Sequence, residues 1–346
     1  MSTVADVALS WLPWDAPSAA EERAVLQRYV RYGSVVGADS AASLLWCGVH
    51  VGGVLRTGFP VVAHRSRAVP GSWLLRVERA GGDDFEPLLD HAAEIFAALR
   101  RAHQYTLRVN VAFYDERPEV RRALAAALTE AGYRPAPPRQ YLETLIAPVL
   151  PTDDEQLASF SNSTRRNIRE AGRSHLVVRP IAYGDFRTEI DRLLVEAFTR
   201  HGKSPEQVEP MLLLSGRAEH SVLFGAFHPI GANHQELVGF AVFEKTGAKC
   251  VYSVAGTARR PELGRTPISY PLLWEGFRWA RQVGCTSVDL GGVPSEEHTD
   301  DPRATIAAFK AGFGGIRATI GGEWQCTPTP LLGMVERTVQ VLRRRG

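Results

Sequence analysis

Hydrophobic positions along residues 1–150 switch between helical and strand spacing in a regular order. The pair Ser18 and Glu21 forms a capping box ahead of apolar residues at helical spacing, which predicts an opening helix. Alternating apolar residues from Leu107 to Phe113 predict a half-buried strand. In full, the pattern predicts a helix, three strands at about 43–50, 53–63 and 72–79, a helix, the strand from Leu107 to Phe113, a helix and a last strand at about 139–146.

The order of three strands, helix, strand, helix and strand returns in residues 151–326. One predicted helix opens at Thr266 and Pro267, and Pro271 inside its first turn implies either a later start or an irregular turn. Other helices are predicted at about 153–161, 163–172, 186–198, 205–215 and 304–312. Strands are predicted at His175–Ile181, Ser221–Phe227, Leu237–Glu244, Lys249–Ala255, Thr286–Leu290 and about 316–325.

An offset of 180 residues places short segments of the first half on segments of the second half. The residues Thr106-Leu107-Arg108-Val109 fall on Thr286-Ser287-Val288-Asp289, and Ala131-Gly132-Tyr133 falls on Ala311-Gly312-Phe313. This period is too long for a solenoid repeat and fits one whole α/β domain used twice. We therefore expect two domains, at about 1–150 and 151–326.

Residues 327–346 carry a separate apolar stripe at helical spacing. This stripe predicts a final helix that packs back on the first domain. Its ending, Arg343-Arg344-Arg345, favours a helix C-terminus, and the alternative is a tail that contacts RNA.

Composition narrows the class of protein. With 45% hydrophobic and 23% charged residues, the chain is expected to be globular and not disordered. Its net charge of +2 gives no global positive field, which argues against a reader of duplex DNA. No apolar run of about 18 residues and no signal-peptide pattern occur, so we expect a cytoplasmic protein without membrane insertion. The four cysteines are far apart, which predicts buried free thiols and no metal site.

Three arginines crowd the start of the helix predicted at 163–172. Arg165, Arg166 and Arg169 follow hydroxyl and amide caps, and cations at a helix N-terminus oppose the helix dipole. A bound phosphate or carboxylate would offset this cost, so the segment predicts an anionic substrate site facing an interdomain cleft. The alternative is a solvated arginine face.

A second basic segment follows the strand predicted at Lys249–Ala255. It contains Tyr252, Arg259 and Arg265, which are candidate contacts to a bound substrate or its phosphates. The loop loosely resembles the pyrophosphate loop of acetyl-CoA-dependent GNAT enzymes. It departs from that pattern because one extra residue separates Arg260 from Gly264 and because Arg265 replaces the second glycine.

The residues Val288-Asp289-Leu290-Gly291-Gly292 and Phe309-Lys310-Ala311-Gly312-Phe313-Gly314-Gly315 together resemble the C-terminal signature of the Fem family of non-ribosomal peptidyltransferases. Segments within residues 130–326 resemble that family in the same order, and no room exists for the helical arm of some members. The resemblance implies an α/β (α+β) protein of two tandem GNAT-like domains with mixed, mostly antiparallel sheets. It also implies an aminoacyl-tRNA donor and an amine acceptor on a peptidoglycan precursor or a peptidyl secondary metabolite. The near-neutral charge of the chain predicts contact with only the acceptor stem and 3′ end of that tRNA.

The reaction implied by this resemblance needs no cofactor, metal or nucleophile, because an aminoacyl ester is more reactive than the amide that forms. The family's lysine implies that Lys310 lies near the carbonyl or the tRNA 3′ end; the alternative is a surface lysine on an amphipathic helix. Asp289 is a candidate proton acceptor or a loop hydrogen-bond partner, and Phe309 a candidate substrate contact. His298 is either a base or part of a solvated acidic loop.

Two rival functions remain at this point. The first is an acyl-CoA-dependent N-acyltransferase on the same fold, since fold does not fix the donor. The second is a non-catalytic binding module that keeps the duplicated fold.

Overall fold

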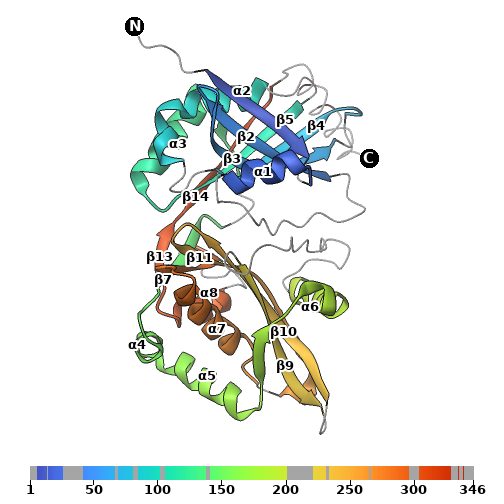
Figure 1. Ribbon diagram of the computed structural model, residues 1–346, viewed down its shortest axis with the longest axis vertical. Coiled ribbons are helices and arrows are strands. Elements are labelled where there is room, and N and C mark those ends of the chain that lie inside the picture. Colours follow the sequence, from blue (N-terminus) through green and yellow to red (C-terminus); the bar gives the residue numbers. More distant parts are fainter. Residues whose placement is uncertain are drawn as a thin grey trace. The chain divides into compact units, whose positions relative to one another are not determined.

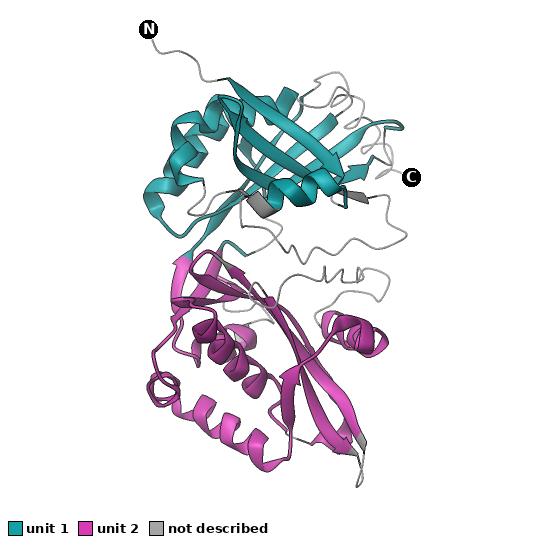
Figure 2. Ribbon diagram, viewed as in Figure 1, with its two compact units in different colours: residues 1–29, 36–142, 319–346 teal, residues 30–35, 143–318 magenta. Residues whose placement is uncertain are grey.

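The computed structural model divides the chain into two compact units (Figure 1, Figure 2). Unit 1 comprises residues 1–29, 36–142 and 319–346, and unit 2 comprises residues 30–35 and 143–318. The structure describes residues 6–13, 15–25, 42–66, 69–80, 85–101, 106–137, 141–200, 221–230, 234–264, 266–295 and 304–328, together with Met334 and Thr338. The helix predicted at 205–215 lies outside these residues, as does most of the final helix predicted over 327–346.

The sheet of unit 1 has helices α2 (Ala92–Arg101) and α3 (Pro118–Glu130), whose apolar residues pack in its core. The short helix η1 (Glu86–His91) precedes α2, and α1 (Pro17–Val25) contributes the buried Ala19. Its strands are, in spatial order, β1 (Val7–Pro13), β2 (Ala42–Val51), β3 (Val54–Arg65), β4 (Trp73–Ala80), β5 (Thr106–Tyr114), β14 (Gly321–Cys326) and β6 (Arg134–Pro135).

The sheet of unit 2 repeats this arrangement. Its strands are, in spatial order, β8 (Val177–Pro180), β9 (Ser221–Ile230), β10 (His234–Thr246), β11 (Lys249–Thr257), β12 (Ser287–Val293), β7 (Glu143–Pro148) and β13 (Ile316–Thr319). Over the described residues, both sheets have seven strands, and each has a parallel pair, β4 with β5 and β11 with β12, that is flanked on both sides by antiparallel pairs. The duplication inferred from the offset of 180 residues is therefore confirmed, and both sheets are mixed as expected.

The two units exchange the strands that complete their sheets. The strand predicted at about 139–146, at the end of the first domain, is β7 and pairs with β12 of unit 2. The strand predicted at about 316–325 is two strands: β13 stays in the sheet of unit 2, and β14 pairs with β5 of unit 1. The predicted boundaries at 150 and 326 therefore lie several residues beyond the divisions at 142 and 318. Sequence order did not reveal the exchange, because β5 and β12 each offer an antiparallel edge that either strand satisfies.

Helices of unit 2 contact the strands of its sheet. Helix α6 (Arg187–Thr199), preceded by η2 (Tyr183–Phe186), contacts β10 and β11, and α7 (Ser269–Gln282) contacts β9 and β10. Helix α7 begins three residues after the predicted Thr266, so Pro271 lies in its first turn, where the missing N–H has no intrahelical acceptor to lose. The four cysteines are buried and free, as predicted.

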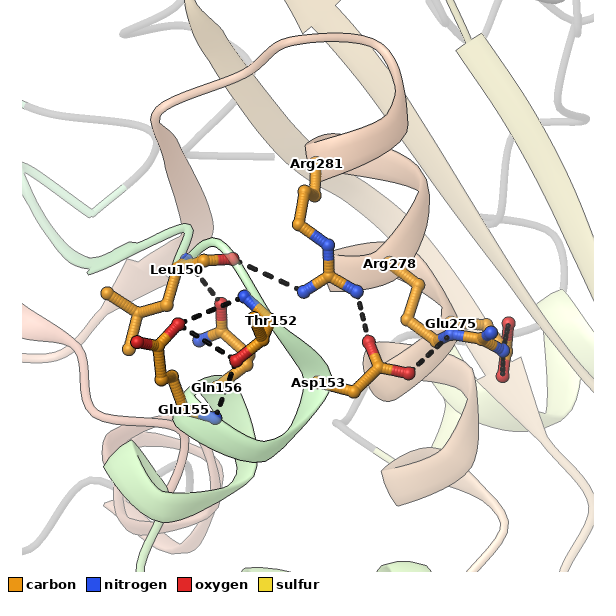
Figure 3. Close-up of polar contacts among 8 residues, drawn as sticks. All are labelled: Leu150, Thr152, Asp153, Glu155, Gln156, Glu275, Arg278 and Arg281. Carbon is orange, nitrogen blue, oxygen red and sulfur yellow. Dashed lines mark hydrogen bonds and ion pairs between the residues drawn. The ribbon is translucent and has the colours of Figure 1, made fainter.

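A polar cluster joins helix α4 (Asp153–Ser159) to the end of α7 (Figure 3). Thr152 and Glu155 form a capping box that starts α4, with the Thr152 Oγ1 accepting from Glu155 N at 3.2 Å. The carboxylate of Asp153 pairs with Arg281 and, at 3.3 Å, with Arg278 Nε. These contacts fix the chain immediately before α5 (Asn162–Arg173), which begins beside the candidate site described below.

The exchange makes β7 part of the folding unit of the second domain. We expect the fragment 143–318 to unfold cooperatively and the fragment 151–318 to show no cooperative transition. The shorter fragment loses β7, with the buried Leu145 and Ala147, and leaves β12 without its antiparallel partner. Far-UV circular dichroism during thermal unfolding compares the two fragments. Equal cooperative melts for both would contradict this role of β7.

Candidate active site

The parallel strand pair of unit 2 opens part-way along its length. Strand β11 pairs with β12 over Lys249–Val251 and Ser287–Asp289, although both strands are described well beyond these residues. In unit 1, the equivalent strands stay paired from Trp73 opposite Thr106 to Ala80 opposite Phe113. The separation of β11 from β12 after Val251 and Asp289, called the parting below, is therefore specific to the second sheet. The residues of the Fem-like motifs meet there.

Helix α8 (Ala304–Ala311) is anchored beside this parting by aromatic packing. The ring of Phe309 packs edge-on against Tyr270 at 4.9 Å, and that of Phe313 against Phe160 at 5.0 Å. A methyl group at Gly312 would lie 2.5 Å from the Thr164 hydroxyl, so a glycine is required where the end of α8 approaches α5. The pattern of aromatic and glycine residues after Phe309 thus fixes the orientation of α8.

The Lys310 side chain lies at the point where β11 and β12 separate. Its Nζ donates a hydrogen bond of 2.9 Å to the carbonyl oxygen of Gly292. A methyl group at Gly291 would lie 3.4 Å from both Lys310 Nζ and the carbonyl oxygen of Tyr252, so the ammonium is close to both strands. The alternative of a surface lysine is wrong, because α8 turns this residue inward and leaves it 8% exposed.

Asp289 supports the backbone turn next to the lysine. Its Oδ1 accepts a hydrogen bond from the Thr144 hydroxyl and one of 2.8 Å from Gly291 N. From Asp289 to Gly292, β12 contains one residue more than β7 opposite it, which makes a β-bulge, and Gly291 has a φ of +80°. The carboxylate is 1% exposed and acts here as a loop hydrogen-bond partner, the second of the two roles expected for it.

Charge at the parting is set by Lys310 and Asp289. Burial lowers the pKa of Lys310 to about 8, and the Asp289 carboxylate opposes this shift by favouring the ammonium. At neutral pH the site therefore holds a mostly protonated amine in a poorly solvated position. Such a group stabilises negative charge strongly and also gives up its proton readily.

Tyr252 and Phe309 flank the same region. The ring of Tyr252 packs against Phe243 at 5.4 Å, and burial raises the pKa of Tyr252, which keeps its hydroxyl protonated. Both Tyr252 and Phe309 are partly exposed, so each retains a surface for a ligand. Their contacts with substrate stay predictions.

The predicted anion site at the start of α5 is not formed as expected. Arg165 Nη1 donates to the carbonyl oxygens of Phe160 at 2.7 Å and Ala158 at 3.0 Å, and its Nη2 donates to Asn162. Those carbonyls lie at the C-terminus of α4, whose dipole favours a cation. The cost of a cation at the α5 N-terminus is therefore offset by a neighbouring helix and requires no bound anion.

The other predicted basic residues differ in surroundings. Arg166 and Arg169 are exposed on α5, and among the described residues they form no hydrogen bond or ion pair, so the solvated-face alternative fits them as well as a ligand does. Arg259 is exposed after β11, whereas Arg265 and His298 lie outside the described residues. Arg200, which no sequence pattern indicated, donates at 2.9 Å to the carbonyl of Thr257, and burial and Arg259 lower its pKa.

The described part of the chain contains neither a cluster of metal ligands nor a helix able to span a membrane. No group of three His, Cys, Asp or Glu side chains there is arranged to hold a metal ion. No helix there has the length and apolar character needed to cross a membrane.

Comparison with known proteins identifies the fold. No family model and no curated protein sequence matches the chain. The solved structure of FemX superposes with a TM-score of 0.65 at 15% identity, over 93% of this chain and 94% of that chain. This chain has the FemX fold. The tandem GNAT-like architecture implied by the Fem resemblance is thereby confirmed, while 15% identity leaves the activity to be argued from the residues.

Two further solved structures align over most of the chain but superpose less closely. A tandem GNAT protein from the clavulanic acid biosynthesis pathway covers 94% of this chain and 99% of that chain, at 14% identity and a TM-score of 0.48. L-PGS from Bacillus licheniformis covers 96% and 98%, at 13% identity and a TM-score of 0.48.

The lowered pKa of Lys310 predicts a pH-dependent stability. The folded protein releases this proton near pH 8, whereas an unfolded lysine keeps a pKa of about 10.4. Between these values the unfolded chain binds more protons, so the free energy of unfolding rises with pH. Relative to Lys310→Met, wild type should gain about 1 to 3 kcal/mol from pH 8 to pH 10.5, measured by urea denaturation. Lys249→Met, on β11, serves as the control. If the free energy of unfolding of Lys310→Met changes with pH in parallel with that of wild type, the lowered pKa of Lys310 is wrong.

The contacts of Arg165 predict a structural role. We expect Arg165→Ala to lower the free energy of unfolding by about 1 to 2 kcal/mol, because carbonyls at the C-terminus of α4 lose a charged donor. The matched variant Arg166→Ala, on the exposed face of the same helix, should change it by less than about 0.5 kcal/mol. Chemical denaturation of both variants measures the two changes in the free energy of unfolding. Equal changes would contradict the structural role of Arg165 and would mean that it behaves like the exposed Arg166.

Proposed function

We propose that this protein is a tRNA-dependent aminoacyltransferase that moves an aminoacyl group from aminoacyl-tRNA to an amine of a peptidyl acceptor. The observation that carries the proposal is the buried ammonium of Lys310 at the parting of β11 and β12. The Fem-like motifs supply this lysine, the bulge beneath it and the aromatic residues that anchor α8. The shared fold with FemX supports the same reading.

The chemistry requires orientation and charge stabilisation. The neutral acceptor amine attacks the ester carbonyl, a C–N bond forms, and the C–O bond to the tRNA ribose breaks. Negative charge develops on the carbonyl oxygen and then on the leaving ribose oxygen, which takes up the proton that the amine releases. An ammonium in a poorly solvated site stabilises both charges, and a pKa of about 8 suits Lys310 for relaying this proton: its ammonium protonates the leaving oxygen, and the resulting amine takes up the proton that the acceptor releases.

The loop after β11 disfavours the rival donor, an acyl-CoA. A pyrophosphate-binding loop presents free backbone N–H groups to the phosphates. Here the N–H groups of Leu263, Gly264 and Thr266 donate to carbonyls within the loop, at 3.0 to 3.1 Å, around the short helix η4 (Pro261–Leu263). Arg260 is held in a two-pronged ion pair with Glu236, with bonds of 2.6 and 2.8 Å. These donors are therefore engaged within the protein.

The proposed partners follow from the reaction. Charged tRNA is the donor and is used as a co-substrate without a further cofactor. Because charged tRNA is a cytoplasmic substrate, we expect the reaction to take place in the cytoplasm. A chain of net charge +2 suits contact with the acceptor stem and 3′ end alone. The acceptor is an amine of a peptidoglycan precursor or of a peptidyl secondary metabolite.

Steady-state kinetics with charged tRNA test the proposal. Lys310→Ala should lower kcat on the order of a hundredfold or more, since one charged contact to the developing oxyanion is lost. Lys310→Arg should rescue poorly, because a planar guanidinium does not reproduce a compact ammonium. Lys249→Ala, which removes a lysine from the paired part of β11, should retain activity.

RNase treatment separates the donors in the same assay. Loss of activity after RNase supports aminoacyl-tRNA, and turnover with acetyl-CoA alone would establish the rival. Full activity of Lys310→Ala would remove the residue from the mechanism and favour a non-catalytic role for the parting.

A further inference from the structure

Thr144 is a fully buried polar residue that no sequence motif indicated. It lies on the exchanged strand β7, directly opposite Gly292 in the register with β12. Its hydroxyl donates to Asp289 Oδ1, the same oxygen that accepts from Gly291 N. A hydroxyl in this position gives the buried carboxylate a donor that water cannot supply.

The contacts form a continuous chain from Thr144 to Lys310. Asp289 fixes Gly291 in a left-handed conformation, and the next residue, Gly292, directs its carbonyl oxygen at Lys310 Nζ. A carboxylate free to rotate would lose its hold on Gly291, and the bulge that aims this carbonyl would relax. The orientation of one carboxylate therefore controls the position of the ammonium.

We propose that Thr144 is a positioning residue of this site. Its hydroxyl orients the Asp289 carboxylate, which holds the bulge of β12 and thereby places the Lys310 ammonium at the parting of the strands. The catalytic consequence rests on the proposed function, whereas the effect on the Lys310 amine is a property of the fold alone. The strand exchange thus contributes a part of the second unit's site as well as its sheet.

The test measures the Lys310 amine directly, without a substrate. Trace acetylation of the folded protein by acetic anhydride at a series of pH values reports the neutral fraction of each amine, resolved by peptide mass spectrometry. The chain has four lysines, Lys203, Lys245, Lys249 and Lys310, so the peptides are few. The variants are Thr144→Val, which removes the hydroxyl at nearly constant shape, and Thr144→Ser, which retains it.

Thr106→Val is the matched control. Thr106 is also a buried strand threonine, and in the described structure its hydroxyl has no hydrogen-bond partner, so this variant loses no polar contact. It should leave the Lys310 titration at its wild-type position.

We expect Thr144→Val to move the Lys310 inflection to lower pH by about 0.5 to 1 unit, because the Asp289 carboxylate is no longer held in place and, once it turns away, its negative charge favours the ammonium less. Thr144→Ser should titrate like wild type. With charged tRNA, Thr144→Val should lower kcat about tenfold or more, with little change in KM, and serine should restore it.

Two results would overturn the proposal: a wild-type titration in Thr144→Val, or equal shifts in the valine and serine variants, which would assign the effect to packing. Thr144→Ala removes the hydroxyl without adding atoms and gives the same readout if the valine variant fails to fold. Failure of the proposed function alone leaves the titration shift intact, so the two failures are distinguishable.

Discussion

The antiparallel edge of β12 is the constraint on which the second unit depends. A buried strand must pair its backbone N–H and C=O groups, and β12 does so with β7, a strand that precedes the other strands of its sheet in sequence. The same strand supplies Leu145 to the core, and its Cβ lies 2.9 Å from where a methyl group at Gly315 would be. It also supplies Thr144 to Asp289. One pairing therefore closes the sheet, seats the end of α8 and completes the polar support of the site.

Burying a lysine is unfavourable, and the local structure compensates for it only in part. A carbonyl oxygen accepts from the ammonium and Asp289 provides an opposite charge, yet burial still dominates and the pKa of Lys310 falls to about 8. Such residual strain is typical of functional sites, where a fold tolerates a cost that a purely structural position would not retain. Aromatic packing of Phe309 and Phe313 holds α8 in place against that cost.

The two units show how one strand order accommodates two different parallel strand pairs inside the sheet. In unit 1 the parallel strands β4 and β5 stay together, whereas in unit 2 β11 and β12 part after three residue pairs. The local causes are visible in the strands themselves. β12 carries a glycine at positive φ within a bulge, and β11 shifts register against β10 between Val242 and Phe243. Duplication thus preserved the strand order while the opening arose from a few backbone irregularities.

Sequence periodicity determined the elements and their repetition, because helical and strand spacing are local properties. The helix predicted at 163–172 formed as α5, and the strand predicted from the alternation of Leu107 to Phe113 formed as β5. The motifs around Asp289 and Lys310 likewise located the site. Sequence alone missed β1, an edge strand without clear alternation, and it misplaced β7 and β14. It also assigned Arg165 to a ligand and overlooked Thr144. Each of these features depends on a partner that is distant in sequence or that only the folded chain brings near: a strand edge for β7 and β14, carbonyls of α4 for Arg165, and the Asp289 carboxylate for Thr144. Only tertiary packing decides which partner each group meets.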